Sequence, residues 1–355
     1  PTFSRASRAN MGLIWCQSKA LGCPQFVRWG FASSRAYGNL AAELKELSGI
    51  DTGYAPTGGI IPCLGEAELE ARAQFIEKLR AETEDGTYPA SVLSRKELEG
   101  MLPKVPFGPE VSGGIWSDMD GYVDPLHLMF AFRKSFVRLG GTLFAGERVS
   151  EVKPSGKGYT VVCGGRTLEC GKAVLAAGLG VRKLAAQLGT DIPVFPNKSQ
   201  VMLLERIPAD VLPIPLLGIA RTFGGTVMIG AAHENMGMDR RLTPEVLAAN
   251  AQWAVRVWPE LERKRILRFW TGLRVWPKDA YPIYDRIPGH ENAFVFAMHS
   301  AVSLAAILEQ ALPDYVMGKP LPPDGAIFGL SRFAGGGSGF QGSAASSPHA
   351  EAPNK

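Results

Sequence analysis

Residues 271–283 read Thr-Gly-Leu-Arg-Val-Trp-Pro-Lys-Asp-Ala-Tyr-Pro-Ile. The first part of this run sets one cation, Arg274, among aromatic and apolar neighbours that cannot neutralise it. A guanidinium held away from water needs an anion, because its planar fork grips a carboxylate through two parallel hydrogen bonds and its unpaired burial is costly. The run therefore predicts that Arg274 meets either an anionic ligand or a structural Asp or Glu.

The segments on both sides of this run suggest strands. Residues 199–207, 216–223, 226–232 and 266–276 are alternating or apolar, and Thr243-Pro244 is typical of the start of a helix that ends near Trp258-Pro259. These patterns predict an antiparallel sheet covered by a helix. Further on, the apolar residues 294–298 predict a buried strand that leads through His299-Ser300-Ala301 into a helix, whose N-terminal dipole would favour an electron-rich ligand.

Earlier in the chain, helices and strands alternate. Pro24 and Gly49 predict the start and the end of a helix over 24–48. Residues 66–84, which are rich in charged side chains, predict an exposed helix. Ser94 and Glu97 have capping-box spacing, and Asp124-Pro125 predicts the start of a helix that reaches residue 140. From 142 to 177 the period changes to two, which predicts an antiparallel meander that feeds a buried strand.

The buried strand at 173–177 runs into Gly178-Leu179-Gly180 and a helix, where backbone N–H groups could face a phosphate. The complete dinucleotide fingerprint GxGxxG is absent here, because Lys183 occupies the position of the third glycine. We therefore expect either a supporting contact to a nucleotide or simple close packing of strand on helix.

Composition excludes several classes of protein. The 355 residues are 46% hydrophobic and 20% charged, which is ordinary globular composition and enough chain for two domains. Because 38 basic and 34 acidic residues are interspersed, the net charge of +4 gives no support for nucleic-acid binding. The chain shows no stretch of about 18 apolar residues and no basic-then-apolar leader, so we expect a soluble, cytoplasmic protein.

Cysteines and histidines lack the spacing of metal ligands. No CxxC pair occurs, so neither zinc nor an iron–sulfur cluster is indicated, and lone histidines are more often structural than ligating. The residues concerned are Cys16, Cys23, Cys63, Cys163, Cys170, His127, His233, His290, His299 and His349.

Several motifs in one order resemble a known family, the FAD-dependent D-amino-acid oxidase superfamily. The resemblance covers about residues 5–333 and is closest to the branch of glycine oxidase, sarcosine oxidase, hydroxyproline dehydrogenase and hydrogen cyanide synthase. The motifs are SRANMG (7–12), GYVDP (121–125), VSEVKPSGKGYTV (149–161), KAVLAAGLGVRKLA (172–185), the run at 271–283, MHSAVSLAA (298–306) and FGLSRF (328–333).

The resemblance implies a site. By this resemblance, Arg274 binds an amino-acid carboxylate. The backbone amides of the turn after residue 298 would approach the pyrimidine edge of the flavin. Met298 and Ala306 stand where many relatives have a glycine and a proline. His299 would then tune the flavin as a catalytic residue, or be a plain structural histidine. The residues implied in FAD binding are Ser7, Arg8, Asn10, Met11, Gly12, Val149 (through its backbone, to adenine), Ala177, Gly178, His299, Ser300, Ala301, Val302, Ser303 and Leu304.

The implied fold is a two-lobed α/β (α+β) structure. A Rossmann-like FAD-binding domain would comprise residues 1–55, 112–192 and 275–333, an antiparallel-sheet substrate domain 56–111 and 193–274, and a Gly- and Ser-rich tail, expected to be disordered, 334–355. The family's initial strand, GxGxxG turn and helix are not seen in the sequence, which predicts a fragment of a longer chain, a complementing polypeptide or a degenerate protein, and poor flavin binding by these residues alone.

The implied reaction is oxidation of a small primary or secondary amino acid to an imino acid by hydride transfer to flavin, with Arg274 holding the carboxylate. An inactive fragment or a non-catalytic subunit of a flavin amine dehydrogenase complex is the alternative, and a nicotinamide dehydrogenase a weaker third. The sequence leaves open the electron acceptor and any partner subunits.

Overall fold

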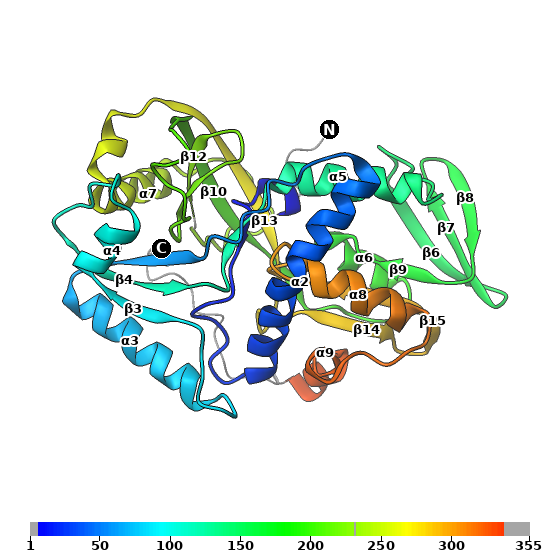
Figure 1. The fold of residues 1–355 in the computed structure, drawn as a ribbon. Coiled ribbons are helices and arrows are strands. Elements are labelled where there is room, and N and C mark those ends of the chain that lie inside the picture. The colour runs from blue at the N-terminus through cyan, green and yellow to red at the C-terminus, as the bar shows by residue number, and fades with distance from the viewer. Residues whose placement is uncertain (1–5, 231, 337–355) are drawn as a thin grey trace.

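The computed structural model describes residues 6–230 and 232–336 and has two lobes (Figure 1). The first lobe contains β2 (Gly59–Leu64), α3 (Glu66–Ala81), β3 (Ser91–Ser94), α4 (Arg95–Met101), β4 (Val111–Ser117), β10 (Val194–Arg206), β11 (Ile219–Arg221), β12 (Thr226–Gly230), α7 (Pro244–Val257), η2 (Pro259–Arg263) and β13 (Ile266–Pro277).

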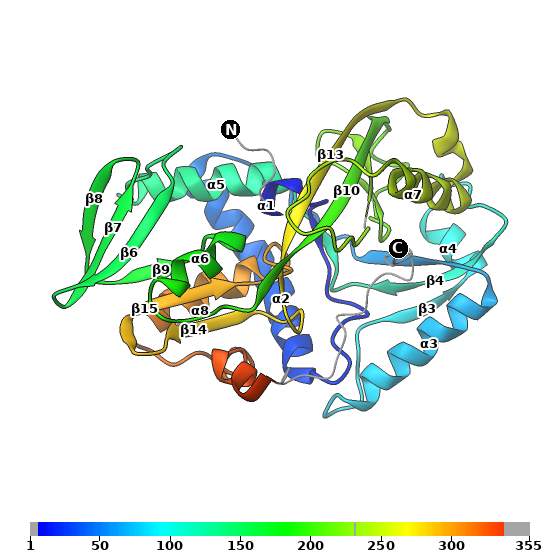
Figure 2. The ribbon, with the colours of Figure 1, turned by 180° about the vertical axis from the view of Figure 1, so that it is seen from behind.

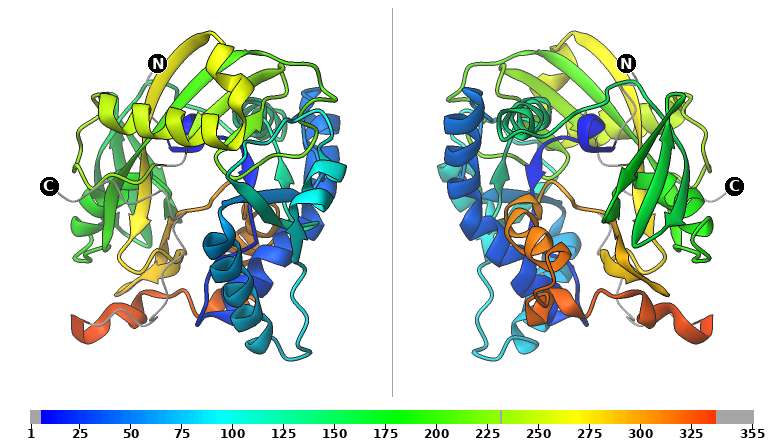
Figure 3. Two further views of the ribbon diagram at one scale, coloured as in Figure 1. Left: turned by 90° about the vertical axis from the view of Figure 1, so that its left-hand side faces the viewer. Right: turned by 90° about the vertical axis from the view of Figure 1, so that its right-hand side faces the viewer.

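The second lobe holds most of the long helices. It contains α2 (Pro24–Ser48), α5 (Pro125–Arg138), β6 (Val149–Ser155), β7 (Gly158–Cys163), β8 (Arg166–Cys170), β9 (Ala173–Leu175), η1 (Gly178–Gly180), α6 (Val181–Ala186), β14 (Ile283–Ile287), β15 (His290–Ala297), α8 (Ala305–Val316), α9 (Pro323–Ala326) and η3 (Leu330–Gly336). Between the lobes lie α1 (Ala6–Ala9), which packs on β13 and α5, and the short pair β1 (Leu13–Ile14) and β5 (Gly121–Tyr122) (Figures 2 and 3).

Two antiparallel sheets build the first lobe. One has the order β11-β12-β10-β13 and the other β2-β4-β3, and a bridge between Ile60 and Leu216 links them. Helix α7 covers them, and Trp258 just beyond it is 1% exposed in their common core. The predicted antiparallel sheet with a covering helix is confirmed. Because β4 pairs with both β2 and β3, residues 112–117 belong to this sheet, and the expected domain boundary at 112 moves past Ser117.

The second lobe joins a sheet of order β14-β15-β9, in which β15 and β9 are parallel, to the antiparallel meander β6-β7-β8. In Figure 2 α6 lies in front of the first of these sheets and α8 behind it. The meander is confirmed, but its first strand begins at Val149 and not at residue 142. Residues 142–148 have no partner strand in the described chain, and Gly146 takes a positive φ of 83° that breaks the extended run.

Helix α2 has the expected bounds, with Pro24 in its first turn and Gly49 in the left-handed C-cap conformation at φ 70°. Its aromatic residues, together with Leu40 and Leu44, are buried in the core against α8 and α5. The capping box of Ser94 and Glu97 is present, and the Asp124 carboxylate accepts hydrogen bonds from the first amides of α5. Helix α3 ends at Ala81, a few residues earlier than expected.

Residues 334–336 complete η3, so the expected tail begins later than residue 334, and its remainder at 337–355 lies outside the described residues. Over the described ranges, no helix combines the length and the apolar character needed to cross a membrane.

Candidate active site

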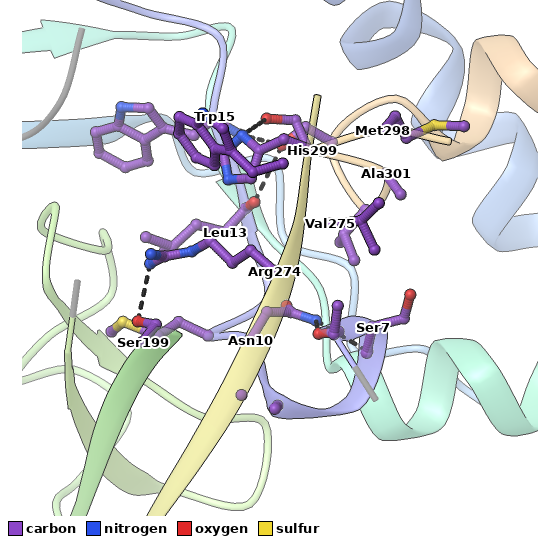
Figure 4. Close-up of a pocket in the computed structure, with 18 of the residues that line it drawn as sticks. Ser7, Asn10, Leu13, Trp15, Ser199, Arg274, Val275, Met298, His299 and Ala301 are labelled. Carbon is purple, nitrogen blue, oxygen red and sulfur yellow. Dashed lines mark hydrogen bonds between the residues drawn. The ribbon is translucent and has the colours of Figure 1, made fainter. Parts of the chain in front are cut away.

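A cavity of about 480 Å³ lies where the segment after α1, the end of β13 and the turn between β15 and α8 meet (Figure 4). Most of its wall is apolar, and its polar side chains come from segments far apart in the sequence. These polar residues include Ser7, Asn10, Gln17, Ser18, Lys19, Arg72, Ser199, His233, Arg274, His299, Ser300 and Ser303.

Strand pairing holds Arg274 at the cavity wall, because it lies opposite Asn197 on β10. Its Nη1 donates to Asn197 Oδ1 at 3.0 Å and to the Ala232 carbonyl at 2.8 Å, and its Nη2 donates to Ser199 Oγ at 2.8 Å (Figure 4). All these acceptors are neutral, and within the described residues no carboxylate lies at ion-pair distance from Arg274. Pairing with a structural Asp or Glu is therefore not what the structure shows.

The guanidinium keeps two donors free for a ligand. It carries five N–H groups, three of which are used by Asn197, Ala232 and Ser199, so the Nε–H and one Nη2–H remain. The nitrogens Nε and Nη2 border one edge of the fork, and this edge can bind both oxygens of a carboxylate. Burial lowers the pKa of Arg274 to about 10, which still leaves it protonated at neutral pH.

His233 lies beside this arginine and is neutral. Burial, and then the charges of Arg274 and Lys19, lower the pKa of His233 to about 3. Its Nδ1 is 3.1 Å from Arg274 Nη1 and 2.9 Å from Asn197 Oδ1. Since a neutral ring nitrogen either donates or accepts, only one of these contacts is a hydrogen bond at a time. His233 therefore adds an uncharged polar wall and no counter-ion.

His299 forms another wall of the cavity. Its ring centroid lies 4.5 Å from that of Trp276, and its Nδ1 is 3.1 Å from Ser300 Oγ. Burial, followed by the nearby cations Arg274 and Lys19, holds the pKa of His299 well below its ordinary value. The imidazole is therefore neutral at physiological pH, and the same surroundings disfavour its protonation.

The turn that contains His299 exposes a row of amides. Strand β15 ends at Ala297 and α8 begins at Ala305, as the sequence predicted, and Ser300 takes a positive φ of 62° between them. The backbone N–H groups of residues 299–303 donate to no described protein atom. Ser303 Oγ accepts from Trp15 N at 3.1 Å and donates to the Leu13 carbonyl at 3.2 Å, which fixes the turn against the N-terminal segment.

The N-terminal motif only partly reaches the cavity. Asn10 ties its own turn together, because its Oδ1 accepts from Gly12 N at 2.7 Å and its Nδ2 donates to the Ser7 carbonyl at 2.8 Å. At Gly12 a Cβ atom would lie 2.0 Å from the Val123 carbonyl oxygen, and φ is +76°. Gly12 is therefore needed for close packing of this segment on β5.

The structure brings together some of the predicted site residues and separates others. Those that line the cavity are Ser7, Asn10, Met11, Gly178, Arg274, His299, Ser300, Ala301, Val302 and Ser303. Those that do not line it are Arg8, Gly12, Val149, Ala177 and Leu304. Val149 is 37% exposed on β6, and Leu304 is 1% exposed in the core.

The sequence analysis did not identify Asp120, a buried carboxyl that supports the loop at residues 16–18. Asp120 Oδ1 accepts from the Cys16 and Gln17 amides at 2.5 and 3.2 Å, and its Oδ2 accepts from Gln17 Nε2 at 2.7 Å. Burial raises the pKa of Asp120 to about 7, against the opposing effect of these hydrogen bonds. The loop presents Gln17 Oε1 and Ser18 Oγ, buried atoms that have no hydrogen-bond partner in the described chain. No local motif marks these residues.

Comparison with known proteins places this geometry in a family. The description "FAD dependent oxidoreductase" (DAO) matches residues 1–308, so the chain belongs to the DAO family of FAD-dependent oxidoreductases. It is 32% identical to an opine oxidase subunit of Rhizobium meliloti over 330 residues, 93% of this chain and 88% of the relative. It is 28% identical to hydrogen cyanide synthase subunit HcnC of Pseudomonas aeruginosa over 321 residues, 87% of this chain and 75% of the relative.

The fold agrees with a solved relative. The crystal structure of glycine oxidase from Geobacillus kaustophilus superimposes with a TM-score of 0.85 at 25% identity, covering 94% of this chain and 90% of that chain. The mixed helical and antiparallel-sheet architecture is thus that of the DAO fold. The protein is an FAD-dependent enzyme of the amino-acid oxidase or dehydrogenase kind.

The cavity fits part of such a cofactor. The unpaired amides of 299–303 before α8 are donors for an electron-rich ring edge, and Gln17 Oε1 and Ser18 Oγ are buried polar atoms that await a partner. The wall around them is mostly apolar and includes Trp15 and Trp276. This combination of a few convergent polar groups in an apolar cavity suits a flavin ring.

Proposed function

We propose that this enzyme oxidises the C–N bond of a small amino acid or an N-substituted amino acid to the imino acid, with the substrate carboxylate bound by Arg274. The observation that carries this proposal is the edge of Arg274 that keeps two N–H donors free in a cavity where no described carboxylate pairs with it. FAD, when bound, supplies the acceptor for the hydride. Arg274 would fix the carboxylate and thereby the orientation of the neighbouring carbon.

The residues proposed to hold the flavin are those of the predicted set that line the cavity. The amides of Ser300–Ser303 would face the ring edge, and Ser7, Asn10 and Met11 would lie along the cofactor on the α1 side. Gly178 approaches the same cavity at φ +58°, where a Cβ would lie 3.3 Å from Val275. Val149, Arg8 and Ala177 remain proposals for the part of FAD beyond this cavity.

Both histidines that line the cavity are neutral. His299 and His233 are both uncharged at physiological pH, so neither repels a cationic amine, and the lowered pKa of His299 makes it a poor base for the proton that such an amine must lose. Among the described lining residues no Asp or Glu is available as a base. We therefore propose that the amine reacts in its neutral form, with His299 against the reacting end.

A partner subunit is the second part of the proposal. Two relatives, the opine oxidase subunit and hydrogen cyanide synthase subunit HcnC, are named as subunits of larger enzymes. We propose that this chain works with other subunits that take electrons from it, and the alternative is a non-catalytic subunit. Size-exclusion chromatography with light scattering of the chain purified from its native host tests this, and a catalytically active monomer would argue against it.

Anaerobic mixing tests the reaction itself. Flavin-loaded protein and an N-alkyl amino acid should give bleaching of the flavin absorbance and release of the corresponding imino acid or its hydrolysis products. The same amine without its carboxylate is the matched control, because it offers the C–N bond but nothing for Arg274 to bind. Bleaching by neither compound would argue for the non-catalytic alternative.

A further inference from the structure

The segment at residues 232–243 supports Arg274 from outside the cavity. The Ala232 carbonyl accepts from Arg274 Nη1 at 2.8 Å, and His233 Nδ1 lies 3.1 Å from the same nitrogen. The middle of the segment, residues 235–238, is exposed. The contacts that fix the two ends of this segment therefore also fix one side of the guanidinium.

The stretch of β10 opposite Arg274 has a different task on each face of the sheet. Because successive side chains of a strand point to opposite faces, Asn197 and Ser199, the acceptors for Arg274, share one face. Lys198, between them, projects on the other face and is 1% exposed. Its backbone exchanges hydrogen bonds of 2.9 Å with that of Glu234 in both directions, and neither of these two residues lines the cavity. The register that supplies the acceptors of Arg274 thus also places a buried lysine against the segment.

Lys198 is the centre of a buried polar network in which its ammonium group has three acceptors for its three donors. Its Nζ lies 3.1 Å from Glu234 Oε2 and donates to Thr243 Oγ1 at 2.7 Å and to the Arg241 carbonyl at 3.1 Å. The Thr243 hydroxyl in turn donates to Glu234 Oε2 at 2.7 Å, and Gln200 Nε2 donates to Glu234 Oε1 at 2.7 Å. The network therefore joins both ends of the segment to one residue of β10.

The side chain of Thr243 serves this network and not its own helix. Thr243 stands at the N-cap position of α7, where a threonine commonly accepts from an amide of the first turn, but its side chain makes no capping hydrogen bond. Its hydroxyl bridges Lys198 and Glu234 instead, and its backbone N–H donates to Gln200 Oε1 at 2.9 Å. Because the side chains of the ion pair are only 1% and 5% exposed, loss of one partner would leave a buried charge.

We propose that Lys198, Glu234 and Thr243 are positioning residues for the substrate carboxylate. They hold residues 232–243 in place, and this segment in turn fixes Nη1 of Arg274, which keeps the edge between Nε and Nη2 directed at the carboxylate. The inference rests on the proposed role of Arg274 in binding the substrate. It adds that this role depends on three side chains that do not line the cavity.

A binding measurement tests this role without any turnover. Methoxyacetate has an ether oxygen where N-methylglycine has its nitrogen, and methoxyacetamide has nearly the same shape without the charge. Binding to the holoenzyme is followed by the fluorescence of Trp15 and Trp276, which line the cavity. Wild type should bind methoxyacetate roughly 10- to 100-fold more tightly than the amide, because a hydrogen bond to a charged group contributes more than one between neutral groups. Thr243→Val keeps the shape of the side chain but removes the hydroxyl, and it should lower this ratio by about 3- to 10-fold, whereas Thr243→Ser should keep it.

Two further variants separate positioning from stability. The double substitution Lys198→Met with Glu234→Leu removes both charges, so that no unpaired charge stays buried, and it should lower the ratio by roughly tenfold. Asp279→Asn is the matched control. It removes one charge from another buried ion pair, in which Arg332 Nε lies 2.7 Å from Asp279 Oδ2 and the side chains are 6% and 0% exposed. This pair ties η3 to the turn after β13, so the control should lower the melting temperature and leave the ratio unchanged.

The outcomes distinguish this inference from the proposed function. A ratio that falls in Thr243→Val and in the double variant, but not in Thr243→Ser or Asp279→Asn, would support the positioning role. An unchanged ratio in Thr243→Val and the double variant, or an equal fall in Asp279→Asn, would overturn it and leave carboxylate binding by Arg274 intact. If the double variant does not fold, Thr243→Val decides between these results.

Two results would bear on the proposed function as well. Equal binding of methoxyacetate and its amide by wild type would overturn the role of Arg274 together with this inference. A ratio that depends on the network, in a protein that oxidises no amine, would support the inference and overturn only the proposed reaction.

Discussion

Replacement of Arg274 by methionine tests the carboxylate site most sharply. Methionine keeps an unbranched side chain but removes the charge and both free donors, the Nε–H and one Nη2–H. Each hydrogen bond to a charged group contributes about 1.5–3 kcal/mol, so two lost bonds cost roughly 3–6 kcal/mol. Because each 1.4 kcal/mol is about tenfold, kcat/KM for amino-acid substrates should fall on the order of 10² to 10⁴.

Stability should respond differently from activity. The substitution removes the donor to the Ala232 carbonyl and to Ser199 Oγ, while Asn197 Oδ1 can still accept from His233 Nδ1, and it also removes a buried cation that has no carboxylate partner. These effects oppose each other, so the melting temperature should change by less than about 4 °C. Steady-state kinetics, thermal melting and flavin content are measured together, with Arg268→Met on the exposed part of β13 as the control. A kcat/KM within threefold of wild type, with flavin retained, would refute the assignment of Arg274.

Three further perturbations have definite expected outcomes. Ser199→Ala removes one support of the guanidinium and should lower kcat/KM for carboxylate substrates by about 3- to 10-fold while leaving the melting temperature nearly unchanged. Gly12→Ala places a Cβ against the Val123 carbonyl at positive φ and should lower the free energy of unfolding by more than about 2 kcal/mol, measured by chemical denaturation. The pKa of Asp120 is raised from 3.8 to about 7, so between these values the folded state binds more protons than the unfolded state and the contribution of Asp120 to stability falls as pH rises. The free energy of unfolding of Asp120→Asn minus that of wild type should therefore become more positive from pH 5 to pH 7, even if the variant is less stable at every pH. A difference that stays constant over this range would contradict the raised pKa of Asp120.

Local signals in the sequence predicted the local structure well. The ends of α2, the capping box at Ser94 and the helix start at Asp124 follow from side chains and backbone preferences within a few residues of each boundary. Prediction was poorer for strands, because a strand forms only where another strand, often distant in the sequence, pairs with it. Residues 142–148 alternate like a strand but have none to pair with, and β4 belongs to the first lobe because of strands β2 and β3 on either side of it.

The site shows the same division. Arg274 could be identified from its own apolar surroundings, and the turn at His299 from the strand and helix that flank it. The hydrogen-bond partners of Arg274 could not be identified from the sequence, because Asn197 and Ser199 contact it only through the register in which β10 pairs with β13. Lys19 and Asp120 are about a hundred residues apart, and only the folded chain shows that one supports the loop of the other.

The most direct test of the central claim is anaerobic reduction of the flavin in purified, flavin-loaded protein by matched amines. We predict that N-alkyl amino acids bleach the flavin absorbance, that the same amines without a carboxylate do not, and that Arg274→Met removes this discrimination while it retains the cofactor. Equal bleaching by both kinds of amine in the wild-type protein would contradict the account, because Arg274 would then have no part in binding the substrate.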